Sequence, residues 1–428
     1  EFHAKTLLIS PLKQKALIEN SQLVDQLIEA GISIFIMNAA MEWDGKSEIL
    51  PSQLKEIEIE DLLPRDEIQV DMEAIGVALH NKSVMITGSA GSIGSEIARQ
   101  VAKFEPHRII MIDQAETPQH DMRLYMHRLH ADLKVETIVT SICNKGRMEE
   151  IFKRYKPDYV FHAAAYKHVP MMENNPCEAI HNNVNGTKII ADLSVKYGVK
   201  KFVMISTDKA VNPTNVMGCS KRLCEIYVQT LDKAIKDGQL QGETQFVTTR
   251  FGNVLGSNGS VIPLFKEQIK SGGPLTVTHP DIYRFFMLIP EACKLVLEAG
   301  TKGHGGEIFV FDMGKPVRIA DLAKRMIKLS GAHGVKIKYT GLRAGEKLYE
   351  ETLNEKETTK PSFHEKIRIA CVREYDYQQV CRNIEDLIQV ALKYDDMQTV
   401  RKMKEIVPEY KSNNSIYSIL DKDEKNKQ

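Results

Sequence analysis

The chain has 428 residues, more than one hydrophobic core usually serves, so two or more structural units are expected. Hydrophobic residues make up 43% and charged residues 27%, which is the composition of an ordinary globular protein. The 57 basic and 57 acidic residues cancel, which argues against a polyanion-binding surface and therefore against nucleic acid as a partner.

The seven cysteines form no CxxC pair, and no histidine lies at metal-ligand spacing. We therefore expect a reducing compartment and no metal site. Cys219 and Cys224 lie in a helical pattern, where buried small side chains are favoured over nucleophiles. No apolar run reaches the roughly 18 residues that a membrane helix needs, and no signal peptide is visible. Because the sequence begins at Glu1 rather than Met, we expect it to be part of a longer protein.

The first 80 residues predict part of a small α/β module (residues 1–52) followed by a linker (residues 53–80). The linker has no clear strand pattern and is expected to contain a helix near Met72–His80. The elements predicted in the module are a strand at Lys5–Ser10, a helix at Gln14–Ala30 and a strand at Ile32–Met37.

From Lys82 onward, short apolar strands alternate with helical stretches, which predicts βαβ units and a doubly wound parallel sheet over residues 81–255. The alternation stops near Gly256, and residues 256–375 are predicted to form a smaller, mainly substrate-binding region. Residues 376–428 predict a helical tail whose last dozen residues are expected to be disordered. The predicted strands are Ser83–Thr87, Arg108–Ile112, Glu136–Thr140, Asp158–His162, Lys201–Ile205 and Phe246–Arg250.

The turn after the first of these strands is rich in glycine. It contains Gly88, Gly91 and Gly94 and leads into a helix, so backbone N–H groups at the helix N-terminus can approach a pyrophosphate. Asp113 follows the second strand, where a carboxylate can bind the adenosine ribose hydroxyls, which favours NAD over NADP. The alternative role for Asp113 is to cap the helix that follows it.

A polar cluster follows the strand that ends at Ile205. It consists of Ser206-Thr-Asp-Lys209, and Met217 and Lys221 lie on the next predicted helix. The spacing of four places Met217 and Lys221 on one helix face. Short-chain dehydrogenases carry a Tyr-x-x-x-Lys pair on such a helix, so Met217 stands at the tyrosine position. The simpler alternative for the Asp-Lys pair is a surface ion pair after a strand.

The run from Ser206 to Arg222 resembles the large bacterial polysaccharide-biosynthesis dehydratases, which are UDP-N-acetylglucosamine 4,6-dehydratases of the capsule and protein-glycosylation type. The resemblance covers about residues 50–370 and implies an extended short-chain dehydrogenase/reductase fold, NAD as cofactor and a hydro-lyase activity. One departure is Thr140-Ser-Ile-Cys-Asn144, where the family has an aspartate, so weaker or backbone contacts to adenine are expected. The other matching motifs are Phe161–Pro170, Arg250–Gly256, Val261–Phe265, Thr278–Met287 and Arg343–Leu348.

A 4,6-dehydration takes a hydride from sugar C4, removes the C5 proton, expels the C6 hydroxyl and returns the hydride to C6. The resemblance implies Asp208 as the acid at C6, Lys209 as the base at C5, Thr207 as the partner of the C4 hydroxyl and Lys221 on the nicotinamide ribose. A lysine base requires a lowered pKa, and both Asp208 and Lys209 reach the sugar only if the strand ends there. Without a tyrosine at Met217, either Thr207 with a water or Asp208 takes the C4 proton.

The remaining predicted site residues follow from the glycine-rich turn and from the family motifs. Arginine suits a diphosphate and an acid suits ribose hydroxyls. The predicted cofactor-binding residues are Gly88, Ser89, Gly91, Ser92, Ile93, Gly94, Asp113, Ala163, Ala164, Ala165, Asn185, Ser206 and Lys221. The predicted substrate-binding residues are Lys167, His168, Asn253, Pro263, Leu264, Arg284, Arg343 and Glu346.

Two other functions stay open. One is a UDP-sugar C4/C5 epimerase or reductase of the same fold, which normally needs the tyrosine that Met217 replaces. The other is a non-catalytic protein that binds NAD and a UDP-sugar. The resemblance further implies retention at C5, a homo-oligomer, and a downstream aminotransferase or reductase as partner. It also places the full-length protein on the cytoplasmic side of the bacterial inner membrane, held by an N-terminal segment outside this sequence.

Overall fold

The computed structural model describes residues 4–10, 13, 16–17, 20–37, 54–56, 68–351, 353 and 358–425. The chain divides into two compact units. Unit 1 comprises residues 1–67, 259–282 and 317–341, and unit 2 comprises residues 68–258, 283–316 and 342–428. The expected substrate-binding region at 256–375 is therefore shared between the two units.

The N-terminal part of unit 1 is a small α/β layer. Strand β1 (Thr6–Ile9) pairs in parallel with β2 (Ser33–Met37), as the sequence predicts, and α2 (Ser21–Glu29) connects them. The helix begins later than expected because the side chain of Asn20 caps it by accepting a hydrogen bond from the Leu23 N–H. Residues 14, 15, 18 and 19 of the predicted helix lie outside the described residues.

Strand β3 (Leu54–Glu56) corrects the expectation that the segment after residue 52 has no strand. It pairs antiparallel with β2, so the available sheet edge outweighs the weak local pattern. Apolar side chains from β1, β2 and α2 form a small core, against which Leu329 of α13 packs. The other elements of unit 1 are α11 (Val261–Lys270), β11 (Leu275–Val277), β15 (Val317–Arg318), α13 (Ile319–Leu329) and β16 (Ile337–Tyr339), with β11 and β16 parallel.

Unit 2 is built on a nine-stranded sheet in the order β17-β18-β14-β9-β8-β7-β4-β5-β6. The strands from β6 to β14 are parallel, and β18 runs antiparallel to both β14 and β17. All six predicted strands are present, and their ends differ from the prediction by no more than two residues. The strands are β4 (Ser83–Thr87), β5 (Arg108–Asp113), β6 (Val135–Val139), β7 (Tyr159–His162), β8 (Lys201–Thr207), β9 (Gln245–Phe251), β14 (Ile308–Phe311), β17 (Thr358–Pro361) and β18 (Ile367–Cys371).

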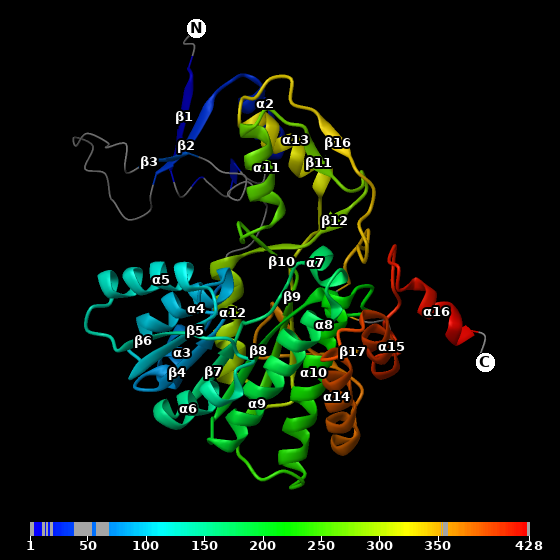
Figure 1. The fold of residues 1–428 in the computed structure, drawn as a ribbon. Helices are drawn as coiled ribbons and strands as arrows, with labels where there is room; N and C mark the ends of the chain where they lie inside the picture. Colours follow the sequence, from blue (N-terminus) through cyan, green and yellow to red (C-terminus); the bar gives the residue numbers. More distant parts are fainter. Residues whose placement is uncertain are drawn as a thin grey trace. The chain divides into compact units, whose positions relative to one another are not determined.

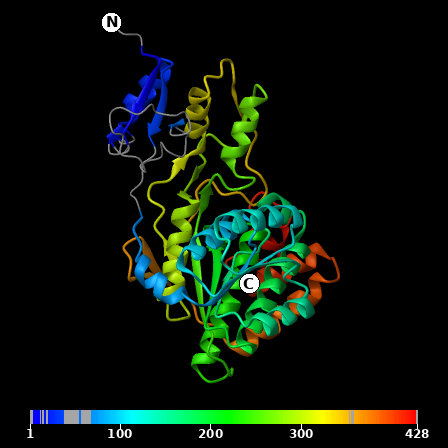
Figure 2. The same cartoon turned by 90° about the vertical axis from the view of Figure 1, so that its left-hand side faces the viewer.

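Helices cover both faces of this sheet, which confirms the predicted doubly wound α/β fold (Figures 1 and 2). Successive residues of a strand enter opposite cores: Phe202 packs on the face of α6, α9 and α10, and Val203 packs on the face of α4 and α12. The helices are α3 (Met72–Leu79), α4 (Ser92–Val101), α5 (Glu116–Leu129), α6 (Lys145–Tyr155), α7 (Val169–Glu173), α8 (Pro176–Ala179), α9 (Gly186–Lys196), α10 (Val216–Lys236), α12 (Ile289–Lys302), α14 (Tyr377–Ala391), α15 (Asp396–Ile406) and α16 (Ser418–Lys425).

Short elements complete unit 2. The 3-10 turns η3 (Ala102–Phe104) and η5 (Asp208–Ala210) follow α4 and β8, and the π-helical turn η4 (Ile180–Asn185) precedes α9. Strands β10 (Asn253–Leu255) and β13 (Phe286–Leu288) pair in parallel, and β12 (Tyr283–Arg284) lies just before β13. Among the described residues, no helix combines the length and the apolarity needed to cross a membrane.

The C-terminal helices are part of the main core. α14 packs along α10, and Ile384 and Leu387 of α14 are fully buried there. The expectation of a disordered end is wrong for the described residues, because α16 continues to Lys425. Tyr417 and Leu420 explain the difference, since both are buried in the same core although the residues after Leu420 are charged.

Replacing Ile384 by alanine tests the contribution of the C-terminal helices to stability. We expect Ile384→Ala to lower the free energy of unfolding by about 2–5 kcal/mol, because it leaves a cavity against α10. The exposed Asp386 on the same helix provides a control, and Asp386→Ala should change stability by about 0.5 kcal/mol or less. Equal urea unfolding midpoints for both variants and the parent protein would show that α14 is not part of the cooperative core.

Candidate active site

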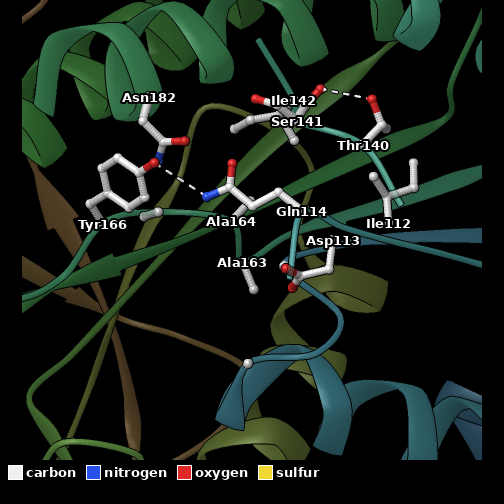
Figure 3. A pocket seen from close by; sticks show the side chains of 13 residues that line it. Ile112, Asp113, Gln114, Thr140, Ser141, Ile142, Ala163, Ala164, Tyr166 and Asn182 are labelled. Carbon is white, nitrogen blue, oxygen red and sulfur yellow. Dashed lines mark hydrogen bonds between the residues drawn. The ribbon is translucent and has the colours of Figure 1, made fainter. Parts of the chain in front are cut away.

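The order of strands in unit 2 places a crevice at β4. This strand lies between β5 and β7, and the chain moves outward in opposite directions from it. Ligands of doubly wound folds bind at such a switch point, at the carboxyl ends of the strands. A pocket lies there, lined by the ends of β4, β5, β6 and β7 (Figure 3). Its lining residues are Gly88, Gly91, Ile112, Asp113, Gln114, Thr140, Ser141, Ile142, Ala163, Ala164, Ala165, Tyr166 and Asn182.

The glycine-rich turn fits a dinucleotide pyrophosphate. Gly88 has φ +70°, and a Cβ there would lie 2.6 Å from the Ala164 backbone nitrogen. A Cβ at Gly94 would lie 2.1 Å from the carbonyl oxygen of Gly88. Gly91 begins α4 without a side-chain cap, so the first N–H groups of this helix are free to bind phosphate oxygens. The tight turn and the uncapped helix together make a dinucleotide-binding site of the Rossmann type.

Asp113 ends β5 at the rim of this pocket. One carboxylate oxygen accepts a hydrogen bond from the Ala90 N–H at 3.0 Å, and the other accepts from the Ala115 N–H at 2.9 Å. The alternative role as a helix cap is not found, because α5 begins after Ala115 without a side-chain cap; Asp113 instead bonds the glycine-rich turn and its own loop. On the other side, the Gln114 amide donates to the Tyr166 hydroxyl at 3.3 Å, which links the ends of β5 and β7 across the pocket (Figure 3).

Three predicted cofactor residues are placed differently from the expectation. The Ser89 hydroxyl is buried and donates to Gln119, so only the backbone of Ser89 faces the turn. The Ser206 hydroxyl is also buried and donates to Glu225. Asn182, rather than Asn185, lines the pocket, because the π-helical turn η4 changes the register of this segment.

The other predicted cofactor residues lie on these same elements. Ala163, Ala164 and Ala165 line the pocket, and Ser92 and Ile93 are in the first turn of α4. Asn183 was not predicted, although its side chain bonds both backbone groups of Tyr166 and the Ser220 hydroxyl. It thereby fixes the loop after β7 to α10. Asn183 can make these bonds because its side chain is buried between the loop and α10. Nothing in the local sequence indicates this role.

Strand β8 ends at Thr207, and Asp208–Ala210 form a 3-10 turn. This end allows Asp208 and Lys209 to face one substrate, because adjacent side chains on a continuing strand would point to opposite faces. The Lys209 ammonium lies 2.9 Å from Oδ1 of Asp208, and the Thr207 hydroxyl donates to the same oxygen at 2.9 Å. Oδ2 of Asp208 is buried and has no hydrogen-bond partner among the described residues. Thr207, Asp208 and Lys209 therefore form one cluster at the end of the sheet.

Lys209 is surrounded by acceptors. In addition to Asp208, its ammonium lies 3.3 Å from Oδ1 of Asn253 and 3.8 Å from Oε1 of Glu350. Burial acts to lower the pKa of Lys209, but the carboxylates of Asp208 and Glu350 outweigh burial and raise the pKa above its ordinary value. The condition stated for a lysine base, a lowered pKa, is therefore not met by this arrangement. Lys209 carries a positive charge here.

Met217 and Lys221 lie in the first turns of α10, and both side chains are buried. Burial lowers the pKa of Lys221. α10 approaches the 3-10 turn closely, since a Cβ at Gly218 would lie 2.1 Å from the Lys209 carbonyl oxygen. Cys219 and Cys224 are buried on this helix, as expected, and burial raises the pKa of both thiols.

A buried ion pair fixes α10 to the strands. The carboxylate of Glu225 accepts hydrogen bonds from Arg250 on β9 and from Ser206 on β8, and it also pairs with Arg222. Burial acts to raise the pKa of Glu225, but Arg250 and Arg222 outweigh burial and lower the pKa to about 2. The charge of Glu225 therefore persists through the physiological pH range and keeps α10 joined to β8 and β9.

The predicted substrate-binding residues are found in three places. Asn253 contacts Lys209, and Lys167 and His168 are exposed in the loop after β7. Pro263 and Leu264 lie on α11 in unit 1. None of these placements by itself identifies a ligand.

Arg284, Arg343 and Glu346 form a group of their own in unit 2. Glu346 pairs with Arg284 at 3.4 Å and with Arg343 at 3.3 Å. Arg284 is nearly buried and also donates to the carbonyl oxygens of Tyr283 and Leu348. Arg343 is exposed, so of the two arginines it is the one more available to a phosphate.

Residues near the C-terminus form hydrogen bonds with two segments of the site. The Lys411 N–H donates to the Pro213 carbonyl, just before α10. Asn413 accepts the Gly345 N–H at its carbonyl, and its side chain donates to the carbonyl oxygen of Glu346. The C-terminal residues thus fix both the loop that precedes α10 and the Arg343–Glu346 segment. None of the sequence motifs includes these C-terminal residues.

The family model for polysaccharide biosynthesis proteins matches residues 84–372, which span the nine-stranded sheet and the site described above. The chain belongs to this family. It is 47% identical over 394 residues to the capsular polysaccharide biosynthesis protein CapD of Staphylococcus aureus, and 44% identical over 367 residues to the probable polysaccharide biosynthesis protein EpsC of Bacillus subtilis. These matches cover 91% and 85% of this chain but only 64% and 60% of those relatives.

Relatives with other names also match. The UDP-glucose 4-epimerase of Rickettsia canadensis is 38% identical over 286 residues, which covers 65% of this chain and 80% of that protein. The solved structure of Pen from Bacillus thuringiensis has a TM-score of 0.63 and 32% identity, covering 70% of this chain and 90% of Pen. DesIV, a dTDP-glucose 4,6-dehydratase from Streptomyces venezuelae with NAD bound, has a TM-score of 0.53 and 21% identity over 61% and 85% of the two chains. The likeness to DesIV is one of fold.

Gly94 provides a test of the cofactor turn. We expect Gly94→Ala to abolish retention of a bound dinucleotide, because the added Cβ overlaps the Gly88 backbone and forces the turn to move. Gly146→Ala on α6 is the matched control, since a Cβ there meets no atom within 4 Å. The measurement is the nucleotide released from each purified protein after denaturation. Equal dinucleotide content in both variants would contradict this assignment of the turn.

Proposed function

We propose that this chain is the catalytic part of an NAD-dependent UDP-N-acetylglucosamine 4,6-dehydratase. One observation carries the proposal: a carboxyl and an ammonium, on Asp208 and Lys209, lie together where β8 ends, while Met217 occupies the position of the usual tyrosine. A dehydratase needs an acid and a base at one sugar ring, and this pair supplies both when Asp208 is protonated and Lys209 is neutral. Family membership in polysaccharide biosynthesis is consistent with a nucleotide-sugar substrate.

NAD fits the pocket at β4. The N-terminus of α4 would bind the pyrophosphate, and Asp113 would face the adenosine ribose, where its charge disfavours a 2′-phosphate. Thr140, Ser141 and Ile142 line the pocket at the expected adenine side. Bound NAD supplies a reversible hydride acceptor, and its presence in the DesIV structure, which has the same fold, agrees with this choice.

The chemistry assigned to the protein is proton transfer. Lys209, once neutral, takes the C5 proton, and Asp208 gives a proton to the departing C6 hydroxyl, which leaves as water. Thr207 would hydrogen-bond the C4 hydroxyl, and Lys221 would orient the nicotinamide ribose. Despite burial, the carboxylates beside Lys209 raise its pKa and hold it protonated. Lys209 therefore becomes neutral in a step of the cycle in which one of these carboxylates moves away or is itself protonated.

The epimerase is the second candidate, and the relative from Rickettsia favours it by name. A C4 epimerase of this fold uses a tyrosine phenol to take the C4 proton. Met217 has no ionisable group and is buried, so this chain lacks that base at the usual position. The non-catalytic alternative leaves the Asp208–Lys209 pair without a role.

The further expectations from the sequence are proposals as well. Retention at C5 is favoured because Met217 is typical of the longer, retaining relatives. A homo-oligomer, a downstream aminotransferase or reductase, and attachment of the full-length protein to the cytoplasmic side of the inner membrane complete the proposal. The 4-keto product is the natural substrate for either partner, since a ketone accepts an amine or a hydride.

The deciding experiment is to incubate the purified protein with UDP-N-acetylglucosamine without added cofactor and to follow the sugar nucleotide by mass spectrometry and NMR. Loss of one water without accumulation of NADH supports the dehydratase, and NMR then gives the C5 configuration. A change of sugar configuration with no change in mass would identify an epimerase. An unchanged substrate, even with NAD⁺ added, would refute the proposed activity on this sugar.

Asp208 provides the sharpest substitution. We expect Asp208→Asn to lower turnover by about 10²–10⁴-fold, because the amide keeps the shape of the side chain but has no proton to give to the C6 oxygen. Binding of UDP-N-acetylglucosamine, measured by calorimetry, should stay close to that of the parent protein. Turnover near the parent value would remove Asp208 from the acid role.

A further inference from the structure

Glu350 is a buried carboxylate that neither the sequence motifs nor the proposed roles include. Its side chain is 4% exposed. Oε1 lies 3.8 Å from the Lys209 ammonium and 3.8 Å from Nε of Arg284. Oε2 is buried and has no hydrogen-bond partner among the described residues. Such a group is costly for a fold, because a buried charge needs full pairing to recover its desolvation.

The charges around Glu350 come from three segments. Asp208 and Lys209 face it from the end of β8, Arg284 faces it from β12, and Lys347 lies in its own segment. Burial raises the pKa of Glu350 although Lys209 and Arg284 oppose that rise. The carboxylates of Asp208 and Glu350 therefore share one ammonium, which lies 2.9 Å from the first and 3.8 Å from the second.

Two carboxylates around one lysine solve a problem that the proposed reaction creates. Asp208 must be protonated to act as an acid, and in that state it is no longer a counter-ion for Lys209. When Lys209 takes the C5 proton, a C–H bond breaks, an N–H bond forms and the lysine becomes a cation. That cation needs a carboxylate that is not itself consumed as an acid. Among the described residues, Glu350 is the other carboxylate that forms an ion pair with Lys209.

We propose that Glu350 is a positioning residue that holds Lys209 at the end of β8 and sets its proton affinity during the reaction. This inference rests on the proposed dehydratase function. After the C6 oxygen has taken the proton of Asp208 and left as water, the Lys209 ammonium returns its proton to the Asp208 carboxylate. Asp208 and Lys209 are then as they began, and Glu350 has neither gained nor lost a proton.

Glu350 also joins this pair to the arginine group. Arg284 contacts Oε1 of Glu350 with Nε and Glu346 with its terminal nitrogen. The same guanidinium thus lies between the carboxylate next to Lys209 and the Arg343–Glu346 segment. Arg284 is therefore assigned to holding these carboxylates rather than to direct recognition of a diphosphate.

The test is the pH profile of kcat for Glu350→Gln. Removing the negative charge lowers the pKa of Lys209, so the neutral amine that removes the C5 proton forms at a lower pH. The rising limb of the profile should shift to lower pH by about 1 unit, the smaller end of the effect of a charge within 4–6 Å. Because Glu350 does not touch the substrate in this proposal, KM should change less than kcat.

Glu351→Gln is the matched control. It removes a carboxylate from the adjacent, exposed position, where the side chain pairs with Lys347 and accepts from Asn212. Its pH profile should coincide with that of the parent protein. A shift of the same size in both variants would show that the effect is one of general charge and would overturn the proposal.

A second readout does not depend on the reaction. The rate at which acetic anhydride acylates Lys209, followed by peptide mass spectrometry across pH, reports the pKa of its amine directly. We expect the midpoint to fall in Glu350→Gln and to stay unchanged in Glu351→Gln; an unchanged midpoint in Glu350→Gln refutes the proposal. If the parent protein leaves UDP-N-acetylglucosamine unchanged while the midpoint still shifts, the proposed function fails and the link between Glu350 and Lys209 stands.

Folding is checked by the thermal midpoint and the dinucleotide content of each variant. If Glu350→Gln does not fold, Glu350→Met is used instead, because it fills a similar volume without a charge or an unpaired polar atom. The same acidward shift is expected from it. A folded Glu350→Met protein with the parent pKa at Lys209 contradicts the role of Glu350.

Discussion

The site depends on one buried charge, the carboxylate of Glu225. It lies in the middle of α10 and is held by Arg250 from β9 and by the Ser206 hydroxyl from β8. Glu225 and Arg250 are buried almost completely, so neither charge is stable there without the other. Breaking such a pair costs about 3–5 kcal/mol. The pair ties α10, which carries Met217, to β9, and the Ser206 hydroxyl ties the same carboxylate to β8, which leads into the Asp-Lys turn.

With this connection in place, the local geometry around Lys209 is narrowly determined. β8 has to end at Thr207, because Gly218 brings α10 against the carbonyl oxygen of Lys209. Gly252 has a comparable role on the other side, since a Cβ there would lie 2.5 Å from Oδ2 of Asp208. Because glycine has no side chain, Gly252 leaves space for the carboxylate of Asp208, and Gly218 leaves space for the turn at Lys209. The chemistry of the site is concentrated in a small, tightly packed volume.

The parallel sheet could be predicted from the sequence because its strands are continuous apolar runs that differ clearly from the amphipathic helices between them. β14, β17 and β18 were not predicted, since after Gly256 the chain passes between two units and the alternation is lost. β3 has no clear local pattern either, and it forms by pairing with the edge of β2.

In the site, local motifs were sufficient to predict those groups of residues that lie in one segment of the chain. The glycine-rich turn and the Asp-Lys pair are of this kind, and the structure brings each together as a unit. Glu350 was missed because two adjacent glutamates in a charged segment are typical of a surface. Only tertiary packing places one of them beside Lys209 while the other stays exposed. Asn413 is similar, since its partners are distant in sequence.

The hydrogen bonds of Lys411 and Asn413 have a consequence for how the protein is made. Translation releases the chain from its N-terminus, so the sheet from β4 to β14 is complete well before these residues leave the ribosome. Until then, Pro213 and Gly345 lack the backbone partners that fix their segments. The segments at Pro213 and Gly345 can therefore be fixed only after residues 411–413 have been synthesised.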